Sequence, residues 1–341
     1  MYNNIFVLAS FQYQSGGTES EHQLVGWLND RGSNAYIYYY DQPCINNVPQ
    51  KYRRYNVKIA NVIEDEETNL LIVAETLTEY LYKYKSIKKG IWWLSLNYYL
   101  YAFPYEHAKF VARRYCLPLF TALLLQLFFR KSDKKRFVFG EDRNEIIHFY
   151  NCEYVKQYLD GKGIDEAHMH YLCGPIRDEY FKIGENLDRT IKEDIILYNP
   201  NKGLYFTKLL LLYAKIRKST YRFVPLINMT SEQVAENMRK AKLYIDFGDF
   251  PGPERIPRES VMMRCNLICA KVGSCCNNID IPIPEKYKIT RRFINIPYLY
   301  SEIEKGLNNY QFNFEDFDMY RQKVRQQRTD MDQTLKEVFY C

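Results

Sequence analysis

The chain has 341 residues, and its 47 lysines and arginines against 41 aspartates and glutamates give a net charge of +6 at pH 7. Hydrophobic residues make up 47% and charged residues 26% of the sequence, which excludes a wholly disordered, collagen-like or disulfide-stapled protein. The mild positive charge allows attraction to anionic ligands or lipid head groups. The sequence lacks the strong basic stripe of nucleic-acid-binding proteins, so we expect no nucleic-acid partner.

The first 60 residues predict a strand, a helix and a second strand. The run Ile5–Ala9 is continuously apolar, as expected for a strand that is buried on both faces. After a turn-rich loop, Thr18 and Glu21 match a capping box at the start of a helix. Ala35–Tyr40 then predicts the second strand. Such a unit usually belongs to a parallel sheet.

The alternation of strands and helices recurs in two sets that meet near residues 175–193. In the first set we expect strands at 70–74, 89–95, 145–150 and 168–173, with helices at 77–84 and 153–160. In the second set we expect strands at 195–198, 222–226, 243–247 and 267–270, with helices at 203–216, 231–241 and 257–264. The segment from Phe314 to Phe339 is polar and has helical periodicity. This order predicts an α/β protein.

One segment of the first half, Leu117–Phe129, is almost entirely apolar. It is too short to cross a bilayer, which needs about 20 residues. Five basic residues follow it: Arg130, Lys131, Lys134, Lys135 and Arg136. The segment is either a buried core helix with a solvated basic end, or an in-plane membrane anchor whose basic residues meet anionic lipid.

Ligands of open α/β folds bind at the carboxyl ends of the strands, and the loops there carry the candidate site residues. The sequence has neither the G-x-G-x-x-G fingerprint nor a P-loop, which disfavours a dehydrogenase or an NTPase. Gly16 and Gly17, before the first helix, allow a ligand to approach the backbone closely. Lys202, in the stretch LYNPNKG, would lie at such a strand end, where its ammonium group can hold a diphosphate.

A second candidate loop follows the predicted strand 243–247. Its residues 251–253, Pro-Gly-Pro, predict a rigid loop, and Pro257 is a good first-turn residue for the next helix. Arg255 and Arg258 flank the helix start and can bind phosphate through their forked donors. Glu259 can accept hydrogen bonds from ribose hydroxyls. The glycine-containing loop 271–274 follows the next strand, so several loops predict one ligand crevice.

The sequence predicts no metal site and no general base. Cys265, Cys269, Cys275 and Cys276 lack the paired C-x-x-C spacing of a zinc site, and we expect Asp316-x-Asp318 to lie on the surface. No third partner for His168 and His170 can be named. The N-terminal residues lack a basic region and a cleavage site, so we expect reduced thiols and a cytoplasmic protein.

Several stretches resemble GT-B glycosyltransferases, particularly the family 4-like enzymes of bacterial surface-polysaccharide clusters. The stretches are SGGTESEHQLVGWL, IWWLSLNYY, LYNPNKG and YIDFGDFPGPERIPRESVMMRCNLICAKVGS, which together cover both halves of the chain. In that family a glutamate at the helix start is preceded, eight residues earlier, by a second glutamate. Glu259 matches the first, but Pro251 occupies the second position, where Glu254 is a candidate substitute.

The resemblance implies two Rossmann-like domains that face each other across a cleft. Residues 1–180 would form the acceptor-side domain and 181–312 the nucleotide-sugar donor domain, with a C-terminal helix in 313–341 packing back on the first. The resemblance implies that Lys202 and Arg255 hold the diphosphate and that Glu259 contacts the nucleotide sugar. These three residues form the implied catalytic set. The implied donor-binding residues are Gly16, Gly17, Asn199, Gly252, Glu254, Arg258, Gly273 and Ser274.

The expected function is transfer of a sugar from a nucleoside-diphosphate sugar to a surface-glycan or lipid-linked acceptor, such as a capsule or lipopolysaccharide precursor. We expect no metal and no other cofactor, retention of the anomeric configuration, and a place in the cytoplasm or at the inner face of the membrane, with residues 117–136 as the candidate lipid contact. Two alternatives stay open. One is a non-catalytic glycan-assembly partner with a degenerate site, and the other is a peripheral membrane scaffold.

Overall fold

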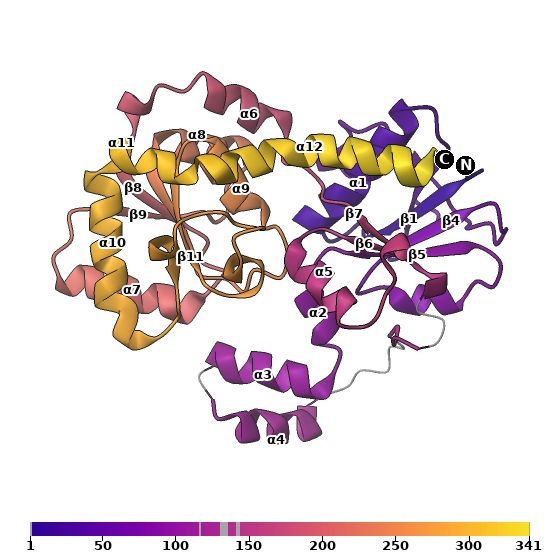
Figure 1. Ribbon diagram of the computed structural model, residues 1–341, viewed down its shortest axis with the longest axis horizontal. Helices are drawn as coiled ribbons and strands as arrows, with labels where there is room; N and C mark the ends of the chain where they lie inside the picture. Colours follow the sequence, from indigo (N-terminus) through magenta and orange to yellow (C-terminus); the bar gives the residue numbers. More distant parts are fainter. Residues whose placement is uncertain (1, 116, 130–135, 141–143, 341) are drawn as a thin grey trace. The chain divides into compact units, whose positions relative to one another are not determined.

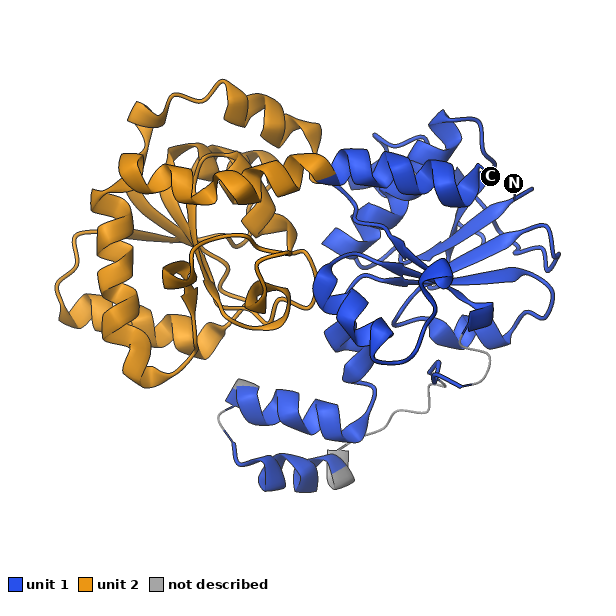
Figure 2. Ribbon diagram, viewed as in Figure 1, with its two compact units in different colours: residues 1–175, 327–341 blue, residues 176–326 orange. Residues whose placement is uncertain are grey.

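The computed structural model describes residues 2–340 except 116, 130–135 and 141–143. The chain forms two compact units (Figure 2): unit 1 comprises residues 1–175 and 327–341, and unit 2 comprises residues 176–326. Each unit contains one parallel β-sheet covered by helices, which confirms the predicted α/β class with two Rossmann-like domains.

Unit 1 is built on a seven-stranded sheet of order β3-β2-β1-β4-β5-β6-β7, in which every neighbouring pair is parallel (Figure 1). Its strands are β1 Ile5–Ala9, β2 Ala35–Tyr39, β3 Lys58–Ile59, β4 Leu70–Ala74, β5 Lys88–Trp93, β6 Ile147–Tyr150 and β7 Met169–Tyr171. Its helices are α1 Gly16–Asp30, α2 Leu96–Leu100, α3 Pro104–Tyr115, α4 Leu119–Phe129 and α5 Glu153–Asp160.

Both faces of the unit 1 sheet are buried, as the continuous apolar strands predict. Alternate residues of β1 belong to different clusters: Phe6 and Leu8 pack on one side, and Ile5 and Val7 on the other. The helix α12 (Asp318–Phe339) contributes Leu335 and other apolar residues to the second cluster. The last part of the C-terminal helix is therefore part of the core of unit 1.

Unit 2 is built on a five-stranded parallel sheet of order β12-β11-β10-β8-β9. Its strands are β8 Glu193–Tyr198, β9 Arg222–Pro225, β10 Ala241–Asp246, β11 Asn266–Ala270 and β12 Lys288–Ile289. Its helices are α6 Asp178–Glu185, α7 Leu204–Ile216, α8 Ser231–Lys240, α9 Arg255–Met262, α10 Ile296–Asn308 and α11 Tyr310–Asn313, together with the first residues of α12.

Some element boundaries differ from the sequence prediction. The N-cap of α1 is Ser15, whose side chain accepts a hydrogen bond from the Thr18 backbone N–H. The helix thus begins before Thr18, and Gly16 and Gly17 lie in its first turn rather than in a loop. The predicted helix at 77–84 is only a 3-10 turn, Thr78–Tyr82. Helix α9 begins at Arg255, two residues before Pro257.

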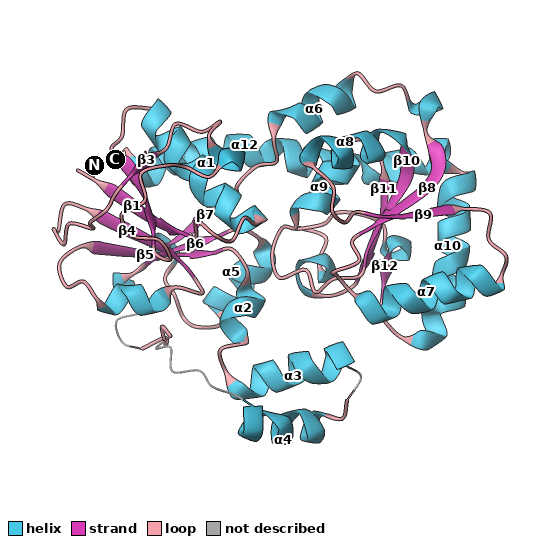
Figure 3. Cartoon of the chain, turned by 180° about the vertical axis from the view of Figure 1, so that it is seen from behind, coloured by secondary structure: helices cyan, strands magenta, loops and turns pink. Residues whose placement is uncertain are grey.

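The apolar segment forms α4, which pairs with α3 in a helical hairpin (Figures 1 and 3). Ala122 is buried, whereas Leu119, Phe120 and Leu124 are exposed, Phe120 to 71%. The interpretation as a buried core helix is therefore wrong. Within the described residues, no helix is long and apolar enough to span a membrane.

The predicted basic end of this segment is only partly described, because residues 130–135 lie outside the described residues. Arg136 donates to the Thr76 carbonyl oxygen and pairs with Glu79 at 3.1 Å, both also in unit 1. Its guanidinium group is thus held by the protein.

Candidate functional site

Three loops at the carboxyl edge of the unit 2 sheet interlock through two glycines. Gly203 has φ +60°, and a Cβ atom there would lie 2.1 Å from the Phe247 carbonyl oxygen. Gly273 has φ +58°, and a Cβ atom there would lie 2.1 Å from the Phe250 carbonyl oxygen. Only glycine fits either position, because both the conformation and the space exclude a side chain. The loops after β8, β10 and β11 thus form one packed edge.

Hydrogen bonds join the same loops. The Ser274 hydroxyl donates to the Gly252 carbonyl oxygen at 2.9 Å. The Ser274 backbone N–H donates to the Phe250 carbonyl oxygen, also at 2.9 Å. Arg291, just after β12, donates to the Phe247 carbonyl oxygen at 2.9 Å. The Ser274 hydroxyl and the Gly252 carbonyl, expected to bind a donor, are therefore used in holding the loops together.

Lys202 lies at this edge among acidic groups. Its Nζ donates to the carboxylate of Glu254, the residue that precedes α9. Its charge also acts on Asp246, the last residue of β10, where burial raises the carboxyl pKa and Lys202 lowers it, with a net increase. Asp246 accepts hydrogen bonds from the Gly248 N–H and the Tyr244 hydroxyl, both at 2.8 Å. The sequence reasoning missed Asp246, although an acidic residue that ends a buried strand is a usable signal.

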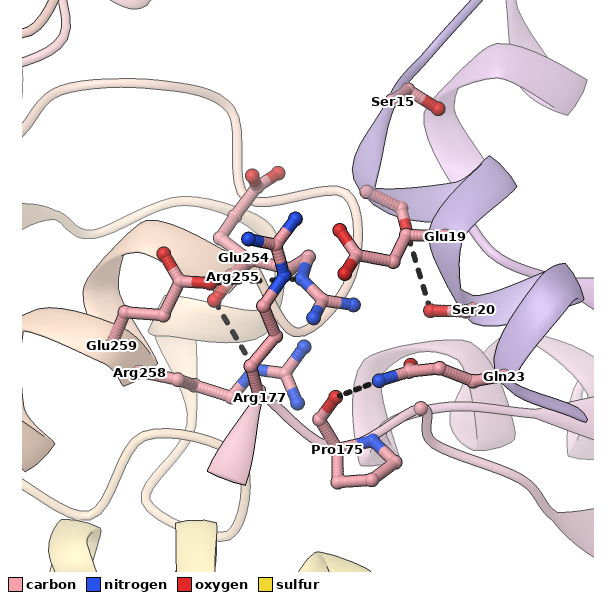
Figure 4. A network of polar contacts seen from close by, with 12 residues as sticks. Ser15, Glu19, Ser20, Gln23, Pro175, Arg177, Glu254, Arg255, Arg258 and Glu259 are labelled. Carbon is pink, nitrogen blue, oxygen red and sulfur yellow. Dashed lines mark hydrogen bonds and ion pairs between the residues drawn. The ribbon is translucent and has the colours of Figure 1, made fainter. Parts of the chain in front are cut away.

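Three arginines gather around the first turn of α9 (Figure 4). The Arg255 Nε lies 3.7 Å from a Glu259 carboxylate oxygen, and the side chains are 12% and 10% exposed. Arg258 is buried and donates from Nε to the Glu254 carbonyl oxygen at 3.3 Å. Arg177, at the N-cap of α6, is the third and is 3.4 Å from Glu179.

The packing of α6 against α9 brings Arg177 to this place. A Cβ atom on Gly184 of α6 would lie 1.9 Å from the Met262 carbonyl oxygen, so the two helices approach as closely as backbones can. Sequence reasoning missed Arg177 because it lies far from Arg255 in the chain, and only the packing of α6 on α9 brings the two together.

The pKa of Tyr180 on α6 responds to charged residues near the starts of both α6 and α9. Burial raises the pKa of its hydroxyl, and so does the negative charge of Glu259. The positive charges of Arg177 and Arg255 act in the opposite direction and lower it. Residues from α6 and from α9 therefore share one electrostatic environment.

The other predicted residues have simpler places. Asn199 accepts a hydrogen bond from the Asn201 N–H at 2.9 Å, which shapes the loop after β8. Gly16 and Gly17 belong to unit 1. Unit 2 therefore brings together Lys202, Glu254, Arg255, Arg258 and Glu259, with Gly252, Gly273 and Ser274 in the adjoining loops.

The described residues contain no group of three or more histidine, cysteine, aspartate or glutamate side chains arranged to hold a metal ion. Asp316 accepts from the Tyr287 hydroxyl, and Asp318 pairs with Arg321, so the Asp-x-Asp carboxylates serve different partners. His22 is buried, with Nδ1 2.7 Å from the Thr18 carbonyl oxygen, and burial lowers its pKa to about 4.

Two Rossmann-like units, each built on one parallel sheet, are the architecture of the GT-B fold. Among solved structures, HepE of Anabaena in complex with UDP-glucose matches with a TM-score of 0.61 and 10% identity, over 99% of this chain and 100% of that one. Sucrose-phosphate synthase from Thermosynechococcus elongatus matches with a TM-score of 0.61 and 11% identity, over 99% of each chain.

WaaG, a glycosyltransferase involved in lipopolysaccharide biosynthesis, matches with a TM-score of 0.56 and 9% identity, over 98% of this chain and 99% of that one. No protein-family model and no curated protein sequence matches the chain. At these identities the likeness shows the shared fold, and it confirms the GT-B architecture that the sequence predicts.

Proposed function

We propose that this protein is a glycosyltransferase that uses a nucleoside-diphosphate sugar as donor. The observation that carries the proposal is the gathering of Arg177, Arg255 and Arg258 at the first turn of α9. Guanidinium groups and a helix N-terminus both favour a bound diphosphate. HepE, which shares the fold, binds UDP-glucose, and this supports the same class of donor here.

Transfer of the sugar mainly requires that the protein stabilise the leaving diphosphate. When the bond between the anomeric carbon and the diphosphate breaks, negative charge develops on the departing oxygen. Arg255, Arg258 and Lys202 would stabilise that charge from fixed positions. We propose that they make a metal ion unnecessary, that Glu259 binds the ribose, and that Glu254 takes the place of the glutamate that Pro251 replaces.

The finer parts of the proposal concern the acceptor and the location. We propose transfer with retention to a surface-glycan or lipid-linked acceptor, as the resemblance to family 4-like enzymes implies. WaaG, a glycosyltransferase of lipopolysaccharide biosynthesis with the same fold, supports an acceptor of this kind. We place the protein in the cytoplasm, at the inner face of the membrane, with the α3–α4 hairpin as the lipid contact.

The alternative of a non-catalytic assembly partner has its own motivation in Pro251 and in the pairing of Lys202 with Glu254. Calorimetric titration of the wild-type protein with UDP, GDP, CDP and dTDP distinguishes the two. We expect one of these nucleotides to bind with a dissociation constant in the micromolar range. Absence of binding for all four would contradict the proposed function.

A separate experiment tests the hairpin. Wild-type protein is expected to float with vesicles that contain phosphatidylglycerol, and replacing both Phe120 and Leu124 with aspartate should weaken this binding by at least about 100-fold, because each apolar side chain contributes about 1.5–3 kcal/mol. The matched control is Val62→Asp, which alters an exposed apolar residue elsewhere in unit 1. Wild-type protein that stays with the soluble fraction would contradict the lipid contact.

A further inference from the structure

Two buried thiols of unit 2 lie directly against each other. Cys269 belongs to β11, and Cys275 belongs to the short 3-10 turn Gly273–Cys276 that follows this strand. Both cysteines are free and buried, and their Sγ atoms are 2.7 Å apart. Heavy atoms in ordinary non-bonded contact are about 3.5–4.0 Å apart, and bonded sulfurs about 2.0 Å. A bond between the two sulfurs therefore requires little movement.

The backbone around the loop after β11 holds the two thiols together. The Lys271 N–H donates to the Ile289 carbonyl oxygen at 2.9 Å, which fixes the chain where it leaves the strand. The chain then turns back through Gly273, which has φ +58°, and the Cys275 N–H donates to the Val272 carbonyl oxygen at 3.1 Å. The position of each thiol is thus set by its backbone, and such proximity favours a reaction between the two.

The two neighbouring cysteines in the sequence have different surroundings. Cys265, just before β11, has its Sγ 3.2 Å from the Met238 carbonyl oxygen and 3.7 Å from the Lys192 Nζ. Cys276 is exposed. A zinc site needs four ligands, and no third histidine, cysteine, aspartate or glutamate joins the pair among the residues that the structure describes. The arrangement therefore suits a reaction within one pair of thiols.

The environment of the pair indicates which reaction this is. Burial raises the pKa of the Cys269 thiol, and the hydrogen bond with Cys275 raises it further, so both thiols are neutral near pH 7. A catalytic nucleophile needs a thiolate, which these surroundings disfavour. Oxidation of the first thiol is expected to be slow for the same reason, but the second thiol is in place to capture the sulfenic acid that forms.

We propose that Cys269 and Cys275 are a redox modification site, at which a peroxide converts the two thiols into a reversible disulfide. One sulfur attacks a peroxide oxygen, the O–O bond breaks, and a sulfenic acid and one water form. The second sulfur then attacks the sulfenic sulfur, the S–S bond forms, and a second water leaves with the remaining thiol proton. Two electrons pass from the thiols to hydrogen peroxide, which becomes two waters.

Access to the pair requires only a local opening of the loop after β11. Hydrogen peroxide is nearly as small as water, and the loop residues Lys271 and Cys276 are already exposed. The disulfide would close a ring over residues 269–275, which includes Gly273 and Ser274, the residues that fasten this loop to the loop after β10. Oxidation would thus fix the edge of the sheet in its present form. This inference does not depend on the proposed function.

Peptide mapping of the folded, full-length protein tests the proposal. The reduced protein is treated with dilute hydrogen peroxide at neutral pH, its remaining thiols are alkylated in denaturant, and it is digested with trypsin. Trypsin cleaves after Lys271, so Cys269 falls in peptide 265–271 and Cys275 in peptide 272–286. We expect the two peptides to appear joined, with the link placed between Cys269 and Cys275 by fragmentation, and to separate after treatment with dithiothreitol.

Variants and a stability measurement complete the test. Cys276→Ser changes the exposed neighbour and should still form the link, whereas Cys275→Ala should lose it. The melting temperature of the oxidised wild type should rise by several degrees, because the ring restricts the unfolded chain, and should fall again with dithiothreitol. Peptides that stay separate in the wild type, a link that forms only in unfolded protein, or a link between Cys275 and Cys276 would each overturn the proposal.

Discussion

Replacing Arg255 with alanine is expected to lower the rate of sugar transfer by about 100- to 1000-fold, the usual cost of removing one preorganised donor from a developing negative charge. Arg255 is the first residue of α9, and in the proposed role its guanidinium group and the helix N-terminus would act on the same anion. The affinity for the nucleoside diphosphate should fall by about 10- to 100-fold, because one charge-assisted hydrogen bond is lost. Calorimetry and a transfer assay with the nucleotide identified by titration measure the two effects.

The controls for this variant separate charge from structure. Arg255→Lys keeps the charge beside Glu259 and should recover part of the nucleotide affinity, although it loses the forked geometry. Arg222→Ala removes an arginine that is 61% exposed and begins β9, at the amino ends of the unit 2 strands. This variant should change neither the rate of sugar transfer nor the nucleotide affinity. Nucleotide affinity equal to that of the wild type in Arg255→Ala would contradict the assigned role.

The sequence predicts the sheets well because a buried parallel strand carries its own signal. Ile5–Ala9 and Leu70–Ala74 are runs of apolar residues bounded by polar ones, and both are strands with these same limits. Helix starts are less predictable. Ser15, Thr18 and Glu21 all suit an N-cap region, and the choice of Ser15 depends on a hydrogen bond to the Thr18 N–H that no spacing reveals.

The candidate site could be predicted only where its residues share a loop. Glu254, Arg255, Arg258 and Glu259 lie within six positions, so helix geometry alone brings them together. Arg177 joins them through the packing of α6 on α9, which a single sequence does not encode as a pattern.

Stability of unit 1 is expected to decrease as the pH rises from about 5 to 8, and Glu75→Gln should remove much of this decrease. Burial raises the pKa of Glu75 from 4.5 to about 7, so the folded state binds the proton more tightly than the unfolded chain does. The stabilisation is complete below the unfolded pKa and is lost as the pH rises through the folded one. A shift of this size corresponds to about 3 kcal/mol.

Neighbouring groups also shift the pKa values of Glu75 and Glu21. Burial and the charge of Glu75 raise the pKa of Glu21, which adds to the same pH dependence, while Arg136 and the backbone donors of Leu94 and Ser95 lower the pKa of Glu75. The free-energy difference between Glu75→Gln and wild type should therefore grow with pH, in favour of the variant. An exposed carboxyl in the same unit provides the control, and its variant, Glu67→Gln, should follow the wild type.

The positions of the tryptophans allow the stability of unit 1 to be measured by fluorescence. The three tryptophans of the chain are Trp27, Trp92 and Trp93, and all belong to unit 1, so tryptophan fluorescence during urea unfolding reports on that unit. Unfolding curves at pH 5.5, 7 and 8 give the free energy at each pH. Parallel pH profiles for wild type and Glu75→Gln would show that Glu75 carries its charge at little cost, since a group with an ordinary pKa leaves stability independent of pH in this range.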